Sequence, residues 1–525
     1  MSNLLGGDSD RPNRNQNVNP TRSPTRSQTR KQTGSQTGNP IFATPPTWSE
    51  MSDYTRYAAF KGRMLILGFG SIGQGSLPLL MRHVEIAPGQ ITIVTAHDSG
   101  REIAARYGVR FINEPVTRDN YRTVYARHLG RGDFLVNASV DVGSVDSIEW
   151  CQQHGVLYLD ACIEPWGGGH TDTSIDIEQR TNYAHRERAL ALRSDDPAAP
   201  TAIVMHGANP GLVSHFVKQA LLELAAMDDP SAAIARPDRR EDWAALAQLL
   251  GIKVIQVSER DHQTTDRRKQ ADEFCNTWSS DAFAGESLQP AEMGWGTHER
   301  HFPLDGRRFD FGCNSSIFLN RTGCTTRVRS WAPQAGPFHG YLISHGEAHS
   351  LTDFLSVRDG DGVQYRPTCY YAYHPCDDAV ASLEQFVERS YRLQPQQRLL
   401  RDELTDGNDE LGVLLCGHAR GAYWYGSQLS VHEARQLSPY NNATGMQVNI
   451  GFVGAIIWAI RHPNAGIVEP EQVDDRLLME ISRPYLGKLE GTFTQWTPLE
   501  HRATLYPEDI DRADPWQFKN FRITM

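Results

Sequence analysis

The chain has 525 residues, of which 39% are hydrophobic and 22% charged. This composition excludes collagen-like and wholly disordered proteins. The length exceeds the roughly 250–300 residues at which one hydrophobic core stops growing, so we expect two or more domains. The formal net charge of −11 argues against a nucleic-acid-binding body, so we expect no nucleic-acid partner.

Residues 1–47 differ in composition from the rest of the chain. They are rich in Ser, Thr, Gln, Asn and Arg, carry six basic and two acidic residues, and have no apolar periodicity. Such a segment cannot bury enough apolar surface to order itself, so we predict a disordered tail. Asp8 and Asp10, together with three prolines, distinguish it from an organelle transit peptide.

Cysteine usage and hydropathy indicate the compartment. The eight cysteines are scattered, form no C-x-x-C pair and follow no secretory signal peptide, which favours a reducing cytoplasm and no structural zinc. The longest apolar run, Ile450–Ile460, has 11 residues, whereas a bilayer-spanning helix needs about 20. We therefore predict a buried helix here and expect no membrane partner.

Between residues 48 and 235, short apolar strands alternate with helices. We predict strands at 63–67, 91–95, 109–112, 134–138, 157–161 and 201–205, and helices at 72–83, 100–107, 121–129, 145–154, 178–193 and 212–225. Parallel strands need crossover connections, which helices supply. The pattern predicts an α/β fold with a Rossmann-type doubly wound parallel sheet.

The alternation disappears from residue 236 to about 440. Short β-like segments at 252–257 and 365–373 lie among aromatic, His and Gly residues, which predicts a second, α+β domain that binds substrate. From Asn442 to Arg461 the pattern is helical, and Pro463 and Gly466 then end it. We expect residues 441–525 to form a C-terminal helical segment that returns toward the first domain.

A glycine motif follows the first predicted strand and opens a helix. Gly68 permits a tight turn, Gly70 lets a pyrophosphate approach the backbone, and Gly73 allows close helix–strand packing. The helix N-terminus then faces the phosphates. This context predicts a site for NAD in residues 48–235, and the alternative is a glycine turn that binds no nucleotide.

The second predicted strand ends at His97-Asp98. Asp98 is placed to accept a hydrogen bond from a ribose 2′-hydroxyl, which favours NAD over NADP. It lies 25 residues beyond Gly73, farther than the usual spacing of about 20. Arg101 close by offers the alternative of a 2′-phosphate partner.

Three further motifs follow the fourth, fifth and sixth strands, where ligands bind in open α/β sheets. They contain Asp141, Glu164 and Asn209. Two carboxylates in one crevice without a neighbouring Lys or Arg suit an amine substrate better than a carboxylate. Taken singly, each acid could instead cap a helix or lie on the surface. The chain has only seven lysines and none lies in these motifs, so a protein-lysine Schiff base is not indicated.

Five separated motifs, in order, resemble those of bacterial homospermidine synthases, which are relatives of saccharopine-dehydrogenase-type enzymes. The motifs are GFGSIGQGSLPLL, NASVDVGS, LYLDACIEPW, HGANPGLVSHF and WSSDAFAGES. The resemblance runs from about residue 61 to residue 488, and the 47-residue tail departs from it.

The resemblance implies an aminobutyl transferase that holds NAD and regenerates it in each turnover. Enzymes of this kind oxidise putrescine, or spermidine, to an imine, exchange ammonia or diaminopropane for a second putrescine, and reduce the new imine. It also implies a homodimer, with the second domain contributing to dimerisation. The implied catalytic residues are Asp141, Glu164, Asn209 and His345; the substrate-binding residues are Glu259, Trp278 and Glu286; the cofactor-binding residues are Gly68, Gly70, Ser71, Ile72, Gly73, Asp98, Asn137, Ser139, Ala161 and Pro210.

Physical chemistry supports several of these roles. Putrescine is a dication near neutral pH, so Glu259 and Glu286 could hold a distal ammonium while the other end loses a proton. Trp278 offers an aromatic face for a cation–π contact, although large aromatic residues are usually packed in the hydrophobic core. His345 is expected to titrate near the working pH and relay protons, although any one of 19 histidines is more often structural. No histidine spacing suggests a metal site.

Two other functional classes remain open at this point. A saccharopine- or carboxynorspermidine-type dehydrogenase would release its reduced cofactor and needs clustered arginines for carboxylate substrates, which Arg321, Arg327 and Arg329 could provide. A non-catalytic nucleotide sensor would keep the glycine motif without the acidic set.

Overall fold

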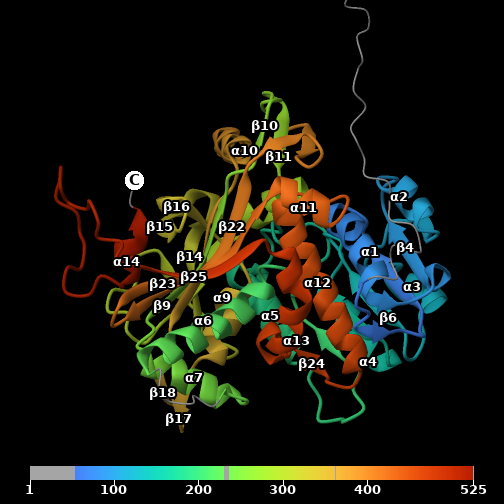
Figure 1. Cartoon of the computed structure of the whole chain (residues 1–525), viewed down its shortest axis with the longest axis horizontal. Coiled ribbons are helices and arrows are strands. Elements are labelled where there is room, and N and C mark those ends of the chain that lie inside the picture. The colour runs from blue at the N-terminus through green and yellow to red at the C-terminus, as the bar shows by residue number, and fades with distance from the viewer. Residues whose placement is uncertain (1–53, 230–235, 361, 524–525) are drawn as a thin grey trace, which may run out of the picture. The chain divides into compact units, whose positions relative to one another are not determined.

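A computed structural model describes residues 54–229, 236–360 and 362–523. The predicted tail, residues 1–47, lies outside these ranges. Two large sheets organise the described residues. A parallel sheet, mostly in blue and teal, lies at the right of Figure 1, and a mixed sheet in green to red lies at its left.

The parallel sheet has the strand order β24-β8-β7-β6-β2-β4-β5, and every neighbouring pair is parallel. Six strands follow the predicted alternation: β2 (Met64–Leu67), β4 (Ile91–Thr95), β5 (Arg110–Asn113), β6 (Phe134–Asn137), β7 (Leu157–Asp160) and β8 (Ala202–Ile203). The predicted doubly wound sheet is therefore confirmed. The seventh strand, β24 (Ile467–Val468), comes from the C-terminal part of the chain. It was not predicted, because two residues are too few to show the alternation of apolar and polar side chains that is typical of a strand.

Helices cover both faces of this sheet, which explains why its strands are nearly continuous hydrophobic runs. Ile66 and Val136 pack in the same cluster as Leu77 of α1, whereas Leu65 and Leu135 pack on the opposite face. The connecting helices are α1 (Ser71–His83), α2 (Arg101–Arg106), α3 (Tyr121–His128), α4 (Ser144–His154) and α5 (Asn182–Leu190). The alternation along each strand thus sends successive side chains into two separate cores.

The mixed sheet has 11 strands and follows the path β13-β14-β12-β19-β9-β22-β23-β25, with β15, β16 and β26 off that path. Its centre is β9, which pairs in parallel with β19 and antiparallel with β22. The strands are β9 (Val254–Asp261), β12 (Pro290–Gly294), β13 (Gly306–Arg308), β14 (Ser316–Thr322), β15 (Arg327–Ala332), β16 (Gly336–Ile343), β19 (Thr368–His374), β22 (Asn408–His418), β23 (Gly421–Ser430), β25 (Lys488–Thr494) and β26 (Arg522–Ile523).

The remaining strands form four two-stranded pairs: β1 (Ala58–Ala59) with β3 (Val84–Glu85), β10 (Thr264–Thr265) with β21 (Leu404–Asp406), β11 (Glu273–Asn276) with β20 (Gln396–Leu399), and β17 (Val357–Asp359) with β18 (Gly362–Tyr365). Helices α7 (Arg240–Leu249), α10 (Asp377–Glu388), α11 (Val431–Leu437) and α14 (Phe518–Phe521) complete this part of the molecule. These pairs are short. Most core side chains belong to the two large sheets and to the helices that pack on them.

Helices join the two sheets. Helix α6 (Leu212–Asp228) follows β8 of the parallel sheet but packs on β22 and β23 of the mixed sheet. Helix α9 (Glu347–Phe354) packs on β12 and β19, and α8 (Ser280–Leu288) follows β11. On the other face of the mixed sheet, Trp424 packs with Trp516, Phe518 and Phe521 from the end of the chain.

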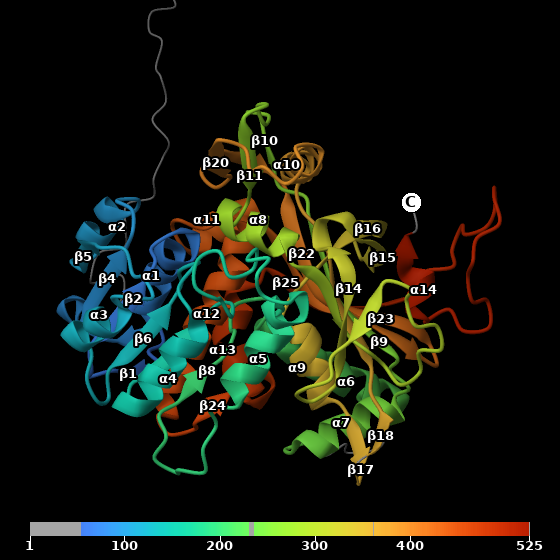
Figure 2. The same ribbon diagram turned by 180° about the vertical axis from the view of Figure 1, so that it is seen from behind.

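Helix α12 (Ala443–Arg461) lies between α1 and the mixed sheet in both Figure 1 and Figure 2. The Asn442 side chain caps its N-terminus by accepting a hydrogen bond from the backbone N–H of Gly445. By length and composition alone α12 could span a membrane, but most of it is buried inside the protein. The predicted C-terminal helical segment also contains β24, β25 and β26 as well as α13 (Asp475–Ser482), so it is less helical than expected.

Candidate active site

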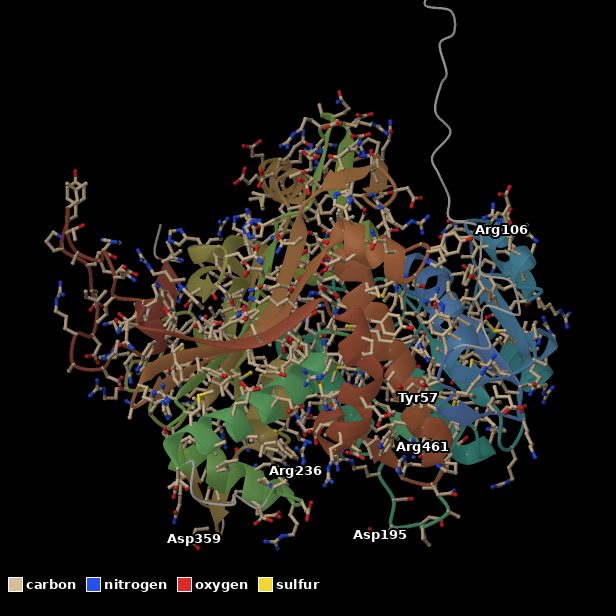
Figure 3. All side chains as sticks on the ribbon, viewed as in Figure 1. Tyr57, Arg106, Asp195, Arg236, Asp359 and Arg461 are labelled. Atoms are coloured by element: carbon tan, nitrogen blue, oxygen red, sulfur yellow. The ribbon has the colours of Figure 1, made fainter. Side chains whose placement is uncertain are left out.

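A cavity of about 390 Å³ opens at the carboxyl ends of β2, β4, β6 and β7. This volume is typical of small-molecule sites. Its opposite wall comes from β9, β19 and α8 of the second half of the chain, and Thr444 of α12 contributes to the lining. Asp195, labelled in Figure 3, lies in the loop that enters β8 at the amino ends of the strands, away from this cavity.

The glycine motif forms one part of the lining. Gly68 has a φ of +77°, and a Cβ added there would lie 2.7 Å from the Cα of Ser139, so only glycine fits this turn. A Cβ added at Gly70 would meet nothing within 4 Å, which leaves open space beside the start of α1. Gly70 is the N-cap of α1 and provides no side-chain cap, so the first backbone N–H groups of the helix are available to an anion. These residues fit a pyrophosphate.

Two predicted cofactor residues do not line the cavity. A Cβ added at Gly73 would lie 2.9 Å from the Phe69 ring, in keeping with the predicted packing role. Asp98 is exposed and forms an ion pair with Arg101, whose hydrogen bond lowers the pKa of the Asp98 carboxyl. Its neighbour His97 does line the cavity. The ribose role of Asp98 stays a prediction.

The other predicted cofactor residues all line the cavity, at the ends of the parallel strands. They are Ser71, Ile72, Asn137, Ser139, Ala161 and Pro210. The Ser139 hydroxyl donates to Asn137 Oδ1 at 2.7 Å, which holds the turn after β6. Asp141 in the same turn lines the cavity too and has a φ of +65°.

Glu259 extends from β9 to the loop after β8 and so joins the two halves of the site. Its side chain is 2% exposed. The Tyr371 hydroxyl donates to Glu259 Oε2 at 2.7 Å, and Asn209 Nδ2 donates to the same oxygen at 3.2 Å. Burial raises the pKa of Glu259 to about 7 despite these hydrogen bonds. A carboxyl group with this pKa can exchange protons at neutral pH.

His345 lies between two acids. Its Nε2 is 3.2 Å from Glu286 Oε2, its Nδ1 is 3.4 Å from Glu347 Oε1, and its ring is 4.4 Å from the Tyr371 ring. Burial favours a neutral imidazole, but Glu347 and Glu286 outweigh it and raise the pKa of His345 to about 10. The expectation that His345 titrates near the working pH was therefore wrong, because the sequence did not show that Glu286 and Glu347 both flank its ring. Burial also raises the pKa of Glu286.

Trp278 and Glu164 complete the predicted set, and both line the cavity. Trp278 Nε1 donates to the Tyr373 hydroxyl at 3.3 Å, which fixes the orientation of the indole. Glu164 Oε2 lies 3.5 Å from His170 Nε2, and Glu164 raises the pKa of this histidine against the effect of burial. All seven predicted catalytic and substrate-binding residues therefore surround one cavity, and their roles remain predictions.

Tyr371 and Thr444 line the cavity but were not singled out in the sequence. Tyr371 lies in the run Tyr370–Tyr373, where a period of two places Tyr371 and Tyr373 on one face of β19. That alternation was a usable signal. Thr444 follows the cap of α12, and nothing local in the sequence indicated that it would reach the cavity.

Comparison with known proteins identifies the family. The family model of the saccharopine dehydrogenase NADP binding domain matches residues 64–204, and that of the saccharopine dehydrogenase C-terminal domain matches residues 207–494. Homospermidine synthase from Blastochloris viridis is 48% identical, with 90% of this chain and 100% of the relative covered. That from Mesorhizobium japonicum is 46% identical, with 89% and 97% covered. The chain belongs to the homospermidine synthase family.

A solved structure of a family member agrees with this assignment. The crystal structure of the homospermidine synthase from Legionella pneumophila in complex with NAD is 47% identical to this chain. It superposes with a TM-score of 0.82 and covers 89% of this chain and 99% of its own. The resemblance seen in the five sequence motifs is therefore confirmed across both halves of the fold.

The charge of the cavity lining bears on the alternative of a dehydrogenase that binds carboxylate substrates. Within the described residues, no lysine or arginine lines the cavity. Arg321 pairs with Asp305, Arg327 stacks on Tyr341, and Arg329 donates to the Glu500 carbonyl, so none of the three serves a carboxylate substrate there. In the part of the chain that the structure describes, no group of His, Cys, Asp and Glu is arranged to hold a metal ion.

Proposed function

We propose that this chain catalyses NAD-dependent aminobutyl transfer between diamines. One putrescine is oxidised to an imine, the amine of a second putrescine displaces ammonia, and reduction of the new imine yields homospermidine. Two putrescine molecules give one homospermidine and one ammonia, without net redox change. Spermidine as the donor would release diaminopropane instead. The observation that carries the proposal is the cavity itself, which places buried acids beside a nucleotide-type glycine loop and, among the described residues, has no lysine or arginine in its lining.

The loops at the ends of the parallel strands would hold NAD. Gly68, Gly70, Ser71 and Ile72 would take the pyrophosphate, and the turn containing Asn137 and Ser139 the nicotinamide side. When bound, NAD supplies a hydride acceptor in the first half-reaction and a hydride donor in the second. NAD is preferred to NADP because a family member binds NAD in its crystal structure and because Asp98 follows β4.

Glu259 is the base in this proposal. An alkyl ammonium must lose a proton before hydride can leave its carbon, and Glu259 has a pKa of about 7. The hydrogen bonds from Tyr371 and Asn209 hold one carboxylate oxygen, which leaves the other for the amine. His345 is positively charged at this pH, so it can donate a proton or balance charge but cannot accept the proton of the amine. Two groups with pKa values this far apart divide the acid and base roles.

The acids away from Glu259 would hold the distal ammonium of the diamine. Glu286 and Glu164 lie in the lining, and Asp141 follows β6. Trp278 presents an indole face to the same space, where a cation–π contact contributes roughly 0.5–2 kcal/mol. These residues bind and orient a dication while Glu259 deprotonates its other end.

Product analysis tests this function. The protein is incubated with putrescine and substoichiometric NAD, and amines, ammonia and NADH are quantified. Homospermidine and ammonia should form over many turnovers without accumulation of NADH. One NADH for each oxidised amine would favour a dehydrogenase, and NAD binding without turnover would indicate a nucleotide sensor.

We also propose a homodimer in the cytoplasm, as the resemblance and the scattered cysteines suggest. All eight cysteines are free in the structure, and six of them are buried. Sedimentation equilibrium at several protein concentrations tests the dimer. A monomer at micromolar concentration would contradict it.

A further inference from the structure

We propose that Glu347 is a positioning residue that keeps His345 in its charged form and turned toward Glu286. The proposal adds to the proposed function a residue that neither lines the cavity nor was predicted from the sequence. Its kinetic part rests on that function, whereas its central test does not.

Glu347 is the first residue of α9 and lies behind His345 as seen from the cavity lining. Its side chain is 1% exposed. A carboxylate at this depth is strongly disfavoured unless a cation or several donors accompany it. Glu347 therefore needs a partner inside the protein.

Among the residues that the structure describes, His345 is the one partner for this carboxylate. Within the described residues, neither carboxylate oxygen of Glu347 accepts a regular hydrogen bond, and His345 Nδ1 likewise has no hydrogen-bond partner. These unsatisfied groups face each other at 3.4 Å. A protonated Nδ1 in an ion pair satisfies both, whereas a neutral imidazole with an unprotonated Nδ1 would leave two lone-pair groups in contact.

The contact of the second ring nitrogen, Nε2, orients the His345 ring. His345 Nε2 lies 3.2 Å from Glu286 Oε2, so the ring bridges an acid behind the cavity and an acid in its lining. The other groups that face this ring are Tyr371 on β19, which packs on it, and Glu259 on β9, which interacts with it through charge. Glu164, after β7, acts on Glu286.

The charge of the three groups matches the proposed ligand. Two carboxylates and one imidazolium leave a single net negative charge, which one ammonium neutralises. Without Glu347, the His345–Glu286 pair would be neutral and would attract the ammonium less. Glu347 thus sets the charge of a site that it does not touch, and its substitution should act through the titration of His345.

A purely structural role is the alternative explanation. An acidic residue in the first turn stabilises a helix through its dipole, and Glu347 occupies that position in α9. Such a role predicts a lower melting temperature on substitution and no change in the protonation of His345. The two explanations therefore differ in a measurable property of one histidine.

The test is a pH titration of histidine-labelled holoenzyme by NMR, with the His345 signal assigned by its loss in His345→Gln. In the natural sequence this imidazole should remain charged to about pH 10. Glu347→Gln keeps the size of the side chain and removes its charge, so the midpoint should fall by roughly 1–3 pH units. Glu347→Asp keeps the charge at a greater distance and should restore part of the shift.

Glu471→Gln is the matched control. Glu471 is 2% exposed and lies outside the cavity lining. It accepts a hydrogen bond from Ser350, which is on helix α9 together with Glu347. This variant should leave the His345 midpoint unchanged. An unchanged midpoint in a folded Glu347→Gln protein would overturn the proposal, whatever its melting temperature.

Kinetics provide a second readout. Removing the charge of Glu347 should lower kcat/KM for putrescine at pH 7, and a midpoint lowered by one to two units should lower it by a further roughly two- to tenfold at pH 9, where less of His345 stays protonated. A uniform loss at every pH would contradict the charge mechanism. If the titration shifts but no homospermidine forms with any variant or with the natural sequence, the proposed function fails and the role of Glu347 stands.

Discussion

The nucleotide half and the amine half of the cavity are built in different ways. In the nucleotide half, consecutive residues form the site: Gly68 and Gly70 provide a turn and open space, and the start of α1 provides backbone donors. In the amine half, Glu259 of β9, Glu286 of α8 and His345 of the loop between β16 and α9 interact through side-chain charges. The first half depends on local backbone geometry, and the second on how distant strands and helices pack.

The halves also differ in how their chemistry is controlled. Backbone N–H groups do not change their protonation state near neutral pH, so cofactor binding by the nucleotide half should depend little on pH. The acids of the amine half are buried near one another, and the pKa of each depends on its neighbours. Substitutions in the amine half should therefore change turnover and its pH dependence, whereas those in the nucleotide half should change cofactor affinity and folding.

Removing the proposed base should have the largest effect. Glu259→Gln keeps the size of the side chain and its contacts with Tyr371 and Asn209, but it cannot accept a proton. We expect kcat for putrescine to fall roughly 10²- to 10⁴-fold while NAD binding remains. Steady-state kinetics and NAD titration by calorimetry check this result. A loss below threefold would assign the base to another residue.

Glu286→Gln tests the holding of the distal ammonium. Loss of a charge-assisted contact costs roughly 1.5–3 kcal/mol, or roughly 10- to 150-fold in kcat/KM for putrescine. NAD affinity should be unchanged, because Glu286 lies on α8 and not at the ends of the parallel strands. Trp278→Phe should cost less than Trp278→Ala, since Phe keeps part of the aromatic face. A kcat/KM equal to that of the natural sequence in Glu286→Gln would place the ammonium elsewhere.

Two glycine variants separate folding from cofactor binding in the nucleotide half. Gly70→Ala places a methyl group in open space, so the melting temperature should hold while NAD affinity falls roughly tenfold or more. Gly68→Ala forces a left-handed backbone and a close contact with Ser139, and should destabilise folding by about 1–3 kcal/mol. Thermal unfolding with and without NAD compares the pair. Equal losses of stability in both variants would mean that Gly70 is structural.

The pH profile sharpens the same comparison. Glu259 is a base only when ionised, so kcat/KM should rise about tenfold between pH 6 and pH 8, through its pKa of about 7. NAD affinity should stay nearly constant over this range. Glu259→Gln should abolish the rise. A profile that is flat from pH 6 to pH 8 in the natural sequence would contradict the assignment.

Asp98→Ala should have the smallest effect. Asp98 is exposed, already pairs with Arg101 and does not line the cavity, so NAD affinity should fall less than about fivefold. Calorimetric titration with NAD and NADP checks this value. A much larger loss for NAD would show that the loop containing Asp98 closes on the ribose when the cofactor binds.

The sequence by itself determined the parallel sheet and the glycine loop. Apolar runs such as Ile91–Thr95 and the Gly68–Gly73 motif carry local periodicity and local backbone requirements, which do not depend on distant residues. The α12 boundaries were readable because Asn442 caps the helix and Pro463 follows it. The resemblance then supplied the members of the amine pocket, which local pattern did not reveal.

The tertiary structure alone decided the short strands and the protonation of the pocket. Strand β24 has two residues and no period of its own, and it exists because β8 offers it a partner. Strand β25 has seven residues, and pairing with β23 made it a strand in a segment that we predicted to be helical. The pKa values of Glu259 and His345 follow from burial and from charged neighbours whose positions around each side chain sequence spacing does not encode. Glu286 shows this most clearly: it is 59 residues from His345 in the chain, and only folding placed its carboxylate 3.2 Å from the imidazole. Together with the nearby Glu347, it decided that this histidine holds charge where the sequence suggested a relay.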